Sequence, residues 1–409
     1  MIAPLIRFKL SWFYLYWVAL FLMGFYIKII IHEIFSYPYI EPNGAFIGSN
    51  QNWNNYFLFA SFASFFIGLT ALIVFSLFNC NRQIEKSNNS KKINFKEWLI
   101  VLMPILILLA INYILKIYVI GLKPKIIFPF YLGVPISYAI YFGIPLILSL
   151  YISRDINYYK RMRLQVVFIT LFLMVLLSLS VGSRAPIVIY ALPILFGGTY
   201  SQMKFNVYPV SYKPYGYAII FLLLSLILVS MLRIIYFYEE SVSDWGLIQF
   251  YFVENLRLFI DRWTGAESLM VGVSYPGSSF ATLKDLMLDV PSTGHAGIYQ
   301  EISGSLEKYI RYRDLEGKVF ATLPGYLGIL ALSGSYFWVS FGVASLTCLG
   351  ILYEYFANKL IPESYPLVSL VAAAIAYFLT QVNFPFYFLI FLVNTAIILI
   401  AFKYIRNYK

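Results

Sequence analysis

The amino-acid sequence predicts an all-α protein: a polytopic transmembrane bundle of about ten spans, with re-entrant or interfacial helices and one large loop outside the cytoplasm. Three observations predict this class: 61% of the 409 residues are hydrophobic, only 12% are charged, and the mean hydropathy is +0.76. Soluble domains are about 45–50% apolar and about 25% charged. The composition therefore excludes a water-soluble enzyme, a nucleic-acid-binding module and a disordered scaffold.

Membrane spans are expected wherever about 20 mostly apolar residues follow one another, because lipid offers the backbone no hydrogen-bond partner. In chain order the candidates are residues 10–31, 56–79, 98–120, 126–152, 164–181, 186–200, 215–234, 335–357, 365–382 and 386–402. Pro186 and Pro193 predict that the sixth helix is tilted or broken. The apolar stretch 320–333 is short and interrupted by proline and glycine, so we expect it to be a re-entrant or interfacial helix that leads into the eighth span.

The distribution of Lys and Arg orients the chain and explains the net charge of +11. If ten helices cross, 17 of the 30 basic residues fall on one face, and the opposite short connections hold only Lys123, Lys125 and Arg184. The basic face is predicted to be cytoplasmic, with both termini inside. The chain then divides into an N-terminal bundle of seven spans (1–234), a large periplasmic loop with interfacial helices (235–334), and three C-terminal helices with a cytoplasmic tail (335–409).

The large loop is where we expect the chemistry, because long folded connections are usually functional. Counted from Arg233, it holds 12 of the 19 acidic residues together with eight basic ones. Residues 243–263 predict a helix on which Glu254, Arg257 and Asp261 share one face. That face is either a solvated salt-bridge ladder or part of a site. A second short apolar helix follows residues 264–267 and ends at Tyr-Pro-Gly (275–277).

Basic residues near the predicted outer ends of the spans have two interpretations. Arg184 lies in the short turn Gly-Ser-Arg-Ala-Pro (182–186), where the glycine permits close backbone approach and the proline suits the first turn of the next helix. An arginine there either meets an anion in a water-filled cavity or reaches lipid phosphates. For Lys28 and Lys116 we expect snorkelling to the membrane surface.

Histidines and cysteines give little support for a metal site. His295, in a turn of small residues (292–297), is a candidate general base, although a lone loop histidine is more often incidental. His32 is a weaker candidate. Because the two histidines are far apart and Cys80 and Cys348 lie at a helix end and within an apolar run, we expect neither a bound metal, nor a cofactor, nor a disulfide framework.

Three stretches carry a resemblance to a known family. They are G-S-R-A-P at 182–186, R-W-x-G-x-E at 262–267, and L-P-G-Y-L-G-I-L-A-L-S-G-S-Y at 323–336. Together with the layout of about ten spans and one large outer loop, they make the chain similar to the O-antigen, or oligosaccharide repeat-unit, polymerases of the Wzy type. The resemblance implies a GT-C-like membrane glycosyltransferase of the bacterial inner membrane, with its active site in the periplasm.

The reaction implied by this resemblance transfers a glycan from undecaprenyl pyrophosphate onto a sugar hydroxyl of another lipid-linked repeat unit. Donor and acceptor are both undecaprenyl-pyrophosphate-linked oligosaccharides. The protein would also contact the surrounding membrane lipids, and a chain-length-regulating co-polymerase is a candidate protein partner. Nucleic acid is not expected as a partner.

The resemblance also suggests roles for individual side chains. Planar, bidentate arginines suit the pyrophosphate charge that grows during transfer when no metal takes part. The pyrophosphate-binding candidates are Arg184, Arg257 and Arg262, followed by Arg311 and Arg313. The candidates for the base that activates the acceptor hydroxyl are Glu267, Asp261, Glu254 and His295.

Two rival functions stay open at this point. An O-antigen ligase, which transfers the finished glycan to lipid A core, would share the layout and is expected to depend on a histidine in the large loop. A lipid-linked oligosaccharide transporter would be expected to show internal repeats and ionisable residues near the middle of the membrane, and the sequence shows neither.

Overall fold

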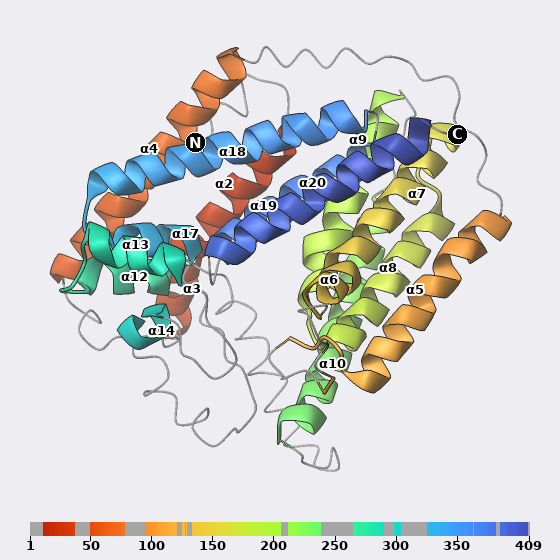
Figure 1. Ribbon diagram of the computed structural model, residues 1–409, viewed down its shortest axis with the longest axis horizontal. Coiled ribbons are helices and arrows are strands. Elements are labelled where there is room, and N and C mark those ends of the chain that lie inside the picture. Colours follow the sequence, from red (N-terminus) through yellow and green to blue (C-terminus); the bar gives the residue numbers. More distant parts are fainter. Residues whose placement is uncertain are drawn as a thin grey trace. The chain divides into compact units, whose positions relative to one another are not determined.

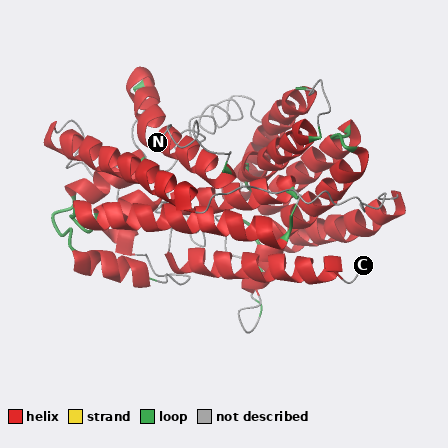
Figure 2. Ribbon diagram, turned by 90° about the horizontal axis from the view of Figure 1, so that it is seen from above, coloured by secondary structure: helices red, strands yellow, loops and turns green. Residues whose placement is uncertain are grey.

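The computed structural model describes residues 11–36, 50–77, 95–120, 125–126, 128, 133–205, 212–238, 265–289, 298–303, 325–362, 364–381 and 385–407. Within these residues every regular element is helical (Figure 1, Figure 2). Seven of the described helices are long and apolar enough to cross a membrane, and shorter apolar helices lie at Tyr365–Thr380 and Phe388–Tyr404. The prediction of a helical, multi-pass membrane protein is confirmed, while ten crossings remain a prediction.

A helix occupies each of the ten stretches predicted to span. In chain order these are α2 (Trp12–Leu22) with η1 (Met23–Ile27) and α3 (Lys28–Phe35), α4 (Asn50–Leu77), α5 (Phe95–Leu115), α6 (Gly133–Tyr138) with η3 (Ala139–Gly143) and α7 (Ile144–Tyr159), α8 (Leu164–Val181), η4 (Ile187–Ala191) with α9 (Leu192–Lys204), α10 (Lys213–Tyr238), α18 (Tyr336–Leu360), α19 (Tyr365–Thr380) and α20 (Pro385–Asn407). Shorter helices of the loop region are α12 (Ala266–Ser274), α13 (Phe280–Leu288), α14 (Ile298–Ser303) and α17 (Gly325–Ala331).

The π-helical turns η3 and η4 accommodate prolines. Pro145 follows η3 and Pro193 follows η4, each in the first turn of the next α-helix. Proline has no N–H, and in a regular helix its ring clashes with the carbonyl four residues earlier. Here that carbonyl belongs to the π-helical turn, whose hydrogen bonds run five residues instead of four. The irregularity predicted for the sixth helix is therefore a widened turn rather than a break.

The described stretch that follows residue 324 is a short buried helix. Helix α17 has seven residues and is about 10 Å long at about 1.5 Å per residue. A hydrocarbon core of about 30 Å needs roughly three times that length. Helix α17 does not span a membrane by itself, in agreement with a re-entrant or interfacial helix.

The chain forms two compact units, each described by itself. The first contains residues 1–82, 259–360 and 375–409. In it, α18 packs against α4, α2 and α20, and α12 packs against α17 and α4 (Figure 1). Glu354 of α18 is buried, and its carboxylate accepts hydrogen bonds from the Ser11 hydroxyl (2.7 Å) and from the backbone N–H of Phe13 (2.9 Å). A carboxylate from a distant helix thus caps the amino end of α2, where the helix dipole favours negative charge.

The second unit contains residues 83–258 and 361–374 and is built around α8, which packs against α10, α5 and η4. The buried amide of Asn112 on α5 donates to the backbone carbonyl of Ser180 (2.9 Å) and to that residue's hydroxyl (2.8 Å). Its carbonyl accepts from the backbone N–H of Tyr118 (2.8 Å). These bonds fix the end of α5 against the end of α8.

Candidate functional site

The structure describes two of the nine predicted site residues, Glu267 and Arg184. The other seven lie outside the described residues, as does the helix predicted at 243–263; they are Glu254, Arg257, Asp261, Arg262, His295, Arg311 and Arg313. The short apolar helix predicted after residue 267 is confirmed, because α12 ends at Ser274 and a turn follows at 275–277.

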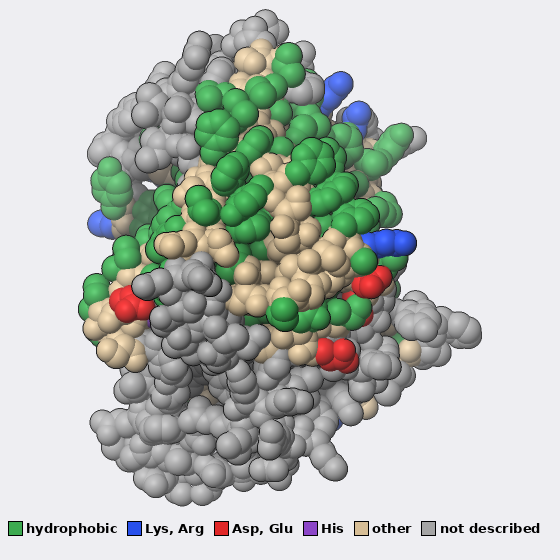
Figure 3. All heavy atoms as spheres, turned by 90° about the vertical axis from the view of Figure 1, so that its left-hand side faces the viewer, with side chains coloured by type: hydrophobic (Ala, Val, Ile, Leu, Met, Phe, Trp, Pro, Cys, Tyr) green, Lys and Arg blue, Asp and Glu red, His purple; other side chains and the backbone are tan. Residues whose placement is uncertain are grey.

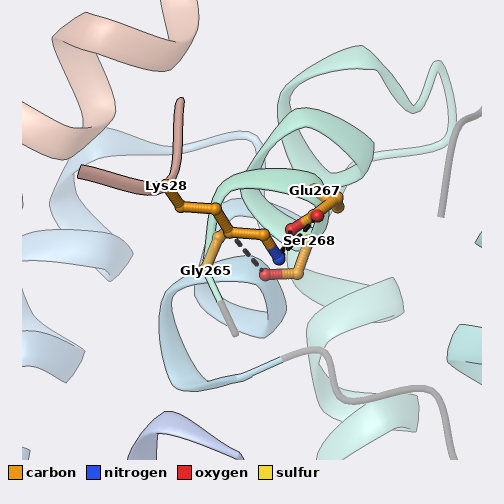
Figure 4. A network of polar contacts seen from close by, with 4 residues as sticks. All are labelled: Lys28, Gly265, Glu267 and Ser268. Atoms are coloured by element: carbon orange, nitrogen blue, oxygen red, sulfur yellow. Dashed lines mark hydrogen bonds and ion pairs between the residues drawn. The ribbon is translucent and has the colours of Figure 1, made fainter. Parts of the chain in front are cut away.

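Glu267 takes part in a buried ion pair. It lies in the first turn of α12 with its side chain almost fully buried, and Lys28, the first residue of α3, is only 1% exposed. The Lys28 ammonium nitrogen lies 2.6 Å from Oε1 and 2.7 Å from Oε2 of Glu267 (Figure 4). The prediction that Lys28 snorkels to the membrane surface is wrong. Its charge is satisfied inside the protein by a carboxylate 239 positions along the chain.

Gly265 allows this approach. Its φ of +156° lies where residues with a side chain are rarely found, and a Cβ at this position would lie 2.9 Å from the carbonyl carbon and oxygen of Gly24 in η1. The start of α12 therefore rests directly on the backbone of the first helix. The Gly265 carbonyl accepts from the Ser268 hydroxyl at 2.9 Å, which closes the first turn of α12 (Figure 4). Lys28 lies four residues after Gly24 in the first helix, so this close approach brings Glu267 next to Lys28.

Helices α12 and α17 cross at small residues. A Cβ on Gly272 would lie 2.7 Å from the Ala331 Cβ, and one on Gly328 would lie 2.6 Å from the Ser268 Cβ. Only small side chains permit such close packing of helix backbones. Helix α12, which begins within the stretch 262–267, and helix α17, which lies within the stretch 323–336, thus belong to one packed structure.

Aromatic side chains hold the other side of α17. Tyr326 is buried, and its ring stacks on Trp17 of α2 with centroids 4.4 Å apart. Burial raises the pKa of the Tyr326 phenol well above its ordinary value. This ring stacking attaches α17 to the first helix, as the ion pair attaches α12.

His32, a weaker candidate in the sequence, lies in the interior of the first unit. It is buried at 1% exposure, one helical turn after Lys28 on α3, so both side chains lie on the same face of this helix. The Lys-x-x-x-His spacing near the end of the first span was the available signal. In the sequence each of these residues alone resembles an interfacial side chain. That Lys28 pairs with Glu267 is seen only in the tertiary structure.

Arg184 belongs to the second unit, and its turn has the predicted geometry. Gly182 ends α8 with φ of +63°, and the N–H of Ser183 donates to the carbonyl of Ser178 (3.0 Å). A Cβ on Gly182 would lie 3.1 Å from the side chain of Val119, which confirms the close approach expected of this glycine. Arg184 itself is partly exposed, directly before the next helix begins at residue 185.

The geometry gives Glu267 an anchoring role. Both of its carboxylate oxygens face the same ammonium group, so accepting a proton from a substrate hydroxyl would require the ion pair to open. A buried, paired carboxylate at the start of a helix fixes that helix in place. In the sequence the anchored turn begins at Gly265, three positions after Arg262. Within the described residues no group of three or more His, Cys, Asp and Glu side chains comes together.

The fold and this site define the chain as a helical membrane protein with a buried ion pair at the entry to its loop helices. Comparison of the chain with protein-family models, with curated proteins and with solved structures gave no match.

Proposed function

We propose that the protein is a polymerase of surface polysaccharide that acts at the periplasmic face of the bacterial inner membrane. One observation carries the proposal beyond the sequence resemblance. Two of the three stretches that resemble the O-antigen polymerases lead into helices that pack on each other: α12 begins within 262–267, α17 lies within 323–336, and the Lys28–Glu267 pair lies at the start of α12. Stretches that serve one site are expected to meet in the fold, whereas chance similarities have no reason to do so.

One contact of the first unit agrees with the expectation that the outer part of the first span and the start of the loop helices lie on the same side of the membrane. The ion pair joins the end of the first span to the start of α12 in the large loop. Both segments were assigned to the periplasmic side from the Lys and Arg distribution alone, and an ion pair requires them to lie on the same side. This agreement is independent of the resemblance.

In the proposed reaction, the acceptor sugar hydroxyl of one lipid-linked repeat unit attacks the anomeric carbon of the donor glycan. The bond from that carbon to the pyrophosphate oxygen breaks, and the hydroxyl proton passes to a protein base. The products are a glycan longer by one unit, still attached to undecaprenyl pyrophosphate, and free undecaprenyl pyrophosphate. Arginines stabilise the charge of the leaving pyrophosphate.

Within this proposal the side chains divide into two groups. Arg184, Arg257 and Arg262 contact the pyrophosphate, with Arg311 and Arg313 as second candidates. Asp261, Glu254 or His295 accepts the proton. Glu267, the remaining candidate base, is assigned instead to positioning, since its ion pair anchors the turn that follows Arg262.

The experiment is complementation of cells that lack their own polymerase. Arg184→Ala and Arg262→Ala are expected to remain in the membrane at normal abundance while the cells display single repeat units instead of long chains. Arg154→Ala is the control, because this exposed arginine of α7 lies on the predicted cytoplasmic side. Normal chain length in both test variants would refute the assignment. Normal chain length with loss of attachment to lipid A core in His295→Ala would favour the ligase.

A further inference from the structure

A small pocket lies in the first unit where α4, α12, the turn after α12 and the start of α18 meet. Its volume is about 210 Å³. The residues that matter for its chemistry are Asn55, Phe59, Tyr275, Ser278, Gly334 and Tyr336. Gly334 and Tyr336 belong to the stretch 323–336, so this pocket adjoins the structure that carries the resemblance.

The described lining of the pocket is polar but uncharged. Among the described residues that line it there is no Lys, Arg, His, Asp or Glu. A phosphate or carboxylate ligand would require a cationic or strongly donating site, and a cation would require carboxylates. Figure 3 shows a face of the molecule on which apolar side chains cover much of the described surface and charged side chains are few. The pocket therefore suits a neutral ligand.

Two aromatic rings are held in place around the pocket. Tyr336 stacks on the buried Phe59 with ring centroids 4.4 Å apart and 27° between the ring planes, while 38% of Tyr336 stays exposed. Tyr275 lies over Gly277, where a Cβ would be 2.7 Å from the ring. Fixed rings with a free polar edge are suited to ligands that have both apolar and hydroxyl surfaces.

Asn55 supplies the hydrogen-bonding group. It is exposed on the first part of α4, and its amide makes no hydrogen bond to any group of the described chain. A primary amide offers two donors and an acceptor that together match adjacent hydroxyls. By contrast, the Ser278 hydroxyl is used within the turn, where it donates to the carbonyl oxygens of Tyr275 (2.8 Å) and Gly272 (3.1 Å). Asn55 is thus a polar side chain that, together with the tyrosine hydroxyls, is available to a ligand.

We infer that this pocket binds one neutral sugar ring of a glycan, with its C–H face against the tyrosines and its hydroxyls on the Asn55 amide. A volume of about 210 Å³ is of the size of a single sugar ring. The inference deepens the proposed function and rests on it for the source of the sugar. Gly272 at the pocket lies about 8 Å along α12 from Glu267 at about 1.5 Å per residue, so this sugar would bind on the same helix that the Lys28–Glu267 pair anchors.

The test has a binding arm that does not depend on activity. The full-length protein, in nanodiscs free of glycolipid, is mixed with methyl glycosides of glucose, galactose and N-acetylglucosamine and with dodecyl maltoside, and saturation-transfer NMR is recorded. At least one probe should receive saturation on its ring C–H protons. Asn55→Leu should reduce this signal at least fivefold, while Asn54→Leu, at a neighbouring residue that is also exposed and lies outside the pocket, should leave it unchanged. Absence of signal from every probe, or equal loss in both variants, would overturn the inference.

The second arm measures polymerisation of a purified lipid-linked repeat unit. Asn55→Leu should raise KM about tenfold, equivalent to about 1.4 kcal/mol of lost binding, and leave kcat within about twofold, because the group binds substrate away from the reacting atoms. An unchanged KM would refute the assignment of this pocket as a sugar subsite, even if the protein polymerises. Sugar binding that depends on Asn55, in a protein that forms no polymer, would refute the proposed function and leave the pocket assignment standing.

Discussion

Replacing Lys28 by methionine removes the cation opposite Glu267 and leaves a carboxylate with a side chain only 6% exposed without its partner. Breaking a buried ion pair in this way costs about 3–5 kcal/mol. Because about 1.4 kcal/mol corresponds to a factor of ten, docking of α12 on the first helix should weaken by a factor of between about one hundred and a few thousand. Glu267→Gln should cost less, since the amide oxygen still accepts one hydrogen bond from the ammonium group.

The measurement is amide hydrogen exchange of residues 266–274 in nanodiscs, which reports local opening of this helix. Lys28→Met should accelerate exchange there by the factor estimated above. Lys96→Met, at an exposed lysine of α5, is the matched control and should leave it unchanged. The double variant Lys28→Met/Glu267→Met should recover most of the protection, because two apolar side chains of similar length replace a buried pair at little cost. Unchanged exchange in Lys28→Met, or a double variant no better than the single one, would refute the reasoning.

Two further predictions concern packing and hydrogen bonding and are checked by the unfolding rate of purified protein at a fixed temperature. Gly328→Ala places a Cβ 2.6 Å from that of Ser268 and 2.9 Å from its backbone carbon, so unfolding should accelerate at a cost of about 1–3 kcal/mol. Gly216→Ala in α10, where a Cβ meets nothing within 4 Å, should be neutral or stabilising by up to about 1 kcal/mol; equal behaviour of the two variants would contradict the proposed crossing. Asn112→Leu leaves the N–H of Tyr118 and the hydroxyl of Ser180 without this partner and should cost about 1–3 kcal/mol for each group left unsatisfied. An unfolding rate equal to that of the unmodified protein would show that other groups replace the amide.

The positions of the helices could be predicted because lipid imposes a strict rule on the backbone, but their ends could not. The second span was expected from residue 56, yet α4 begins at Asn50, because hydropathy detects contact with lipid and not the helix itself. The third was expected to reach residue 120, yet α5 ends at Leu115. After Leu115 the helix ends because Lys116 adopts a φ of +50°. The side-chain carbonyl of Asn112 accepts the hydrogen bond from the N–H of Tyr118.

The candidate site could be predicted only in part. Glu267 and the glycine before it were recognised as one motif, and the turn around Gly182 has the predicted geometry. The role of Lys28 was predicted wrongly, because a lysine near the end of an isolated helix has only the membrane surface to satisfy its charge. The importance of Gly272 and Gly328 could not be predicted, since a glycine in a helix signals close packing only when the opposing residue is known.

The sequence by itself determined the class of the protein, its all-helical construction and the location of its helices, because these depend on composition and on hydrogen bonds within each segment. Its Lys and Arg distribution also predicts an orientation. The tertiary structure alone decided which distant residues meet: Lys28 with Glu267, Gly24 with Gly265, and α12 with α17. The partner of a buried charge can lie anywhere in the sequence, and small residues permit close packing with whichever segment folds against them. Neither kind of contact can therefore be predicted from local spacing.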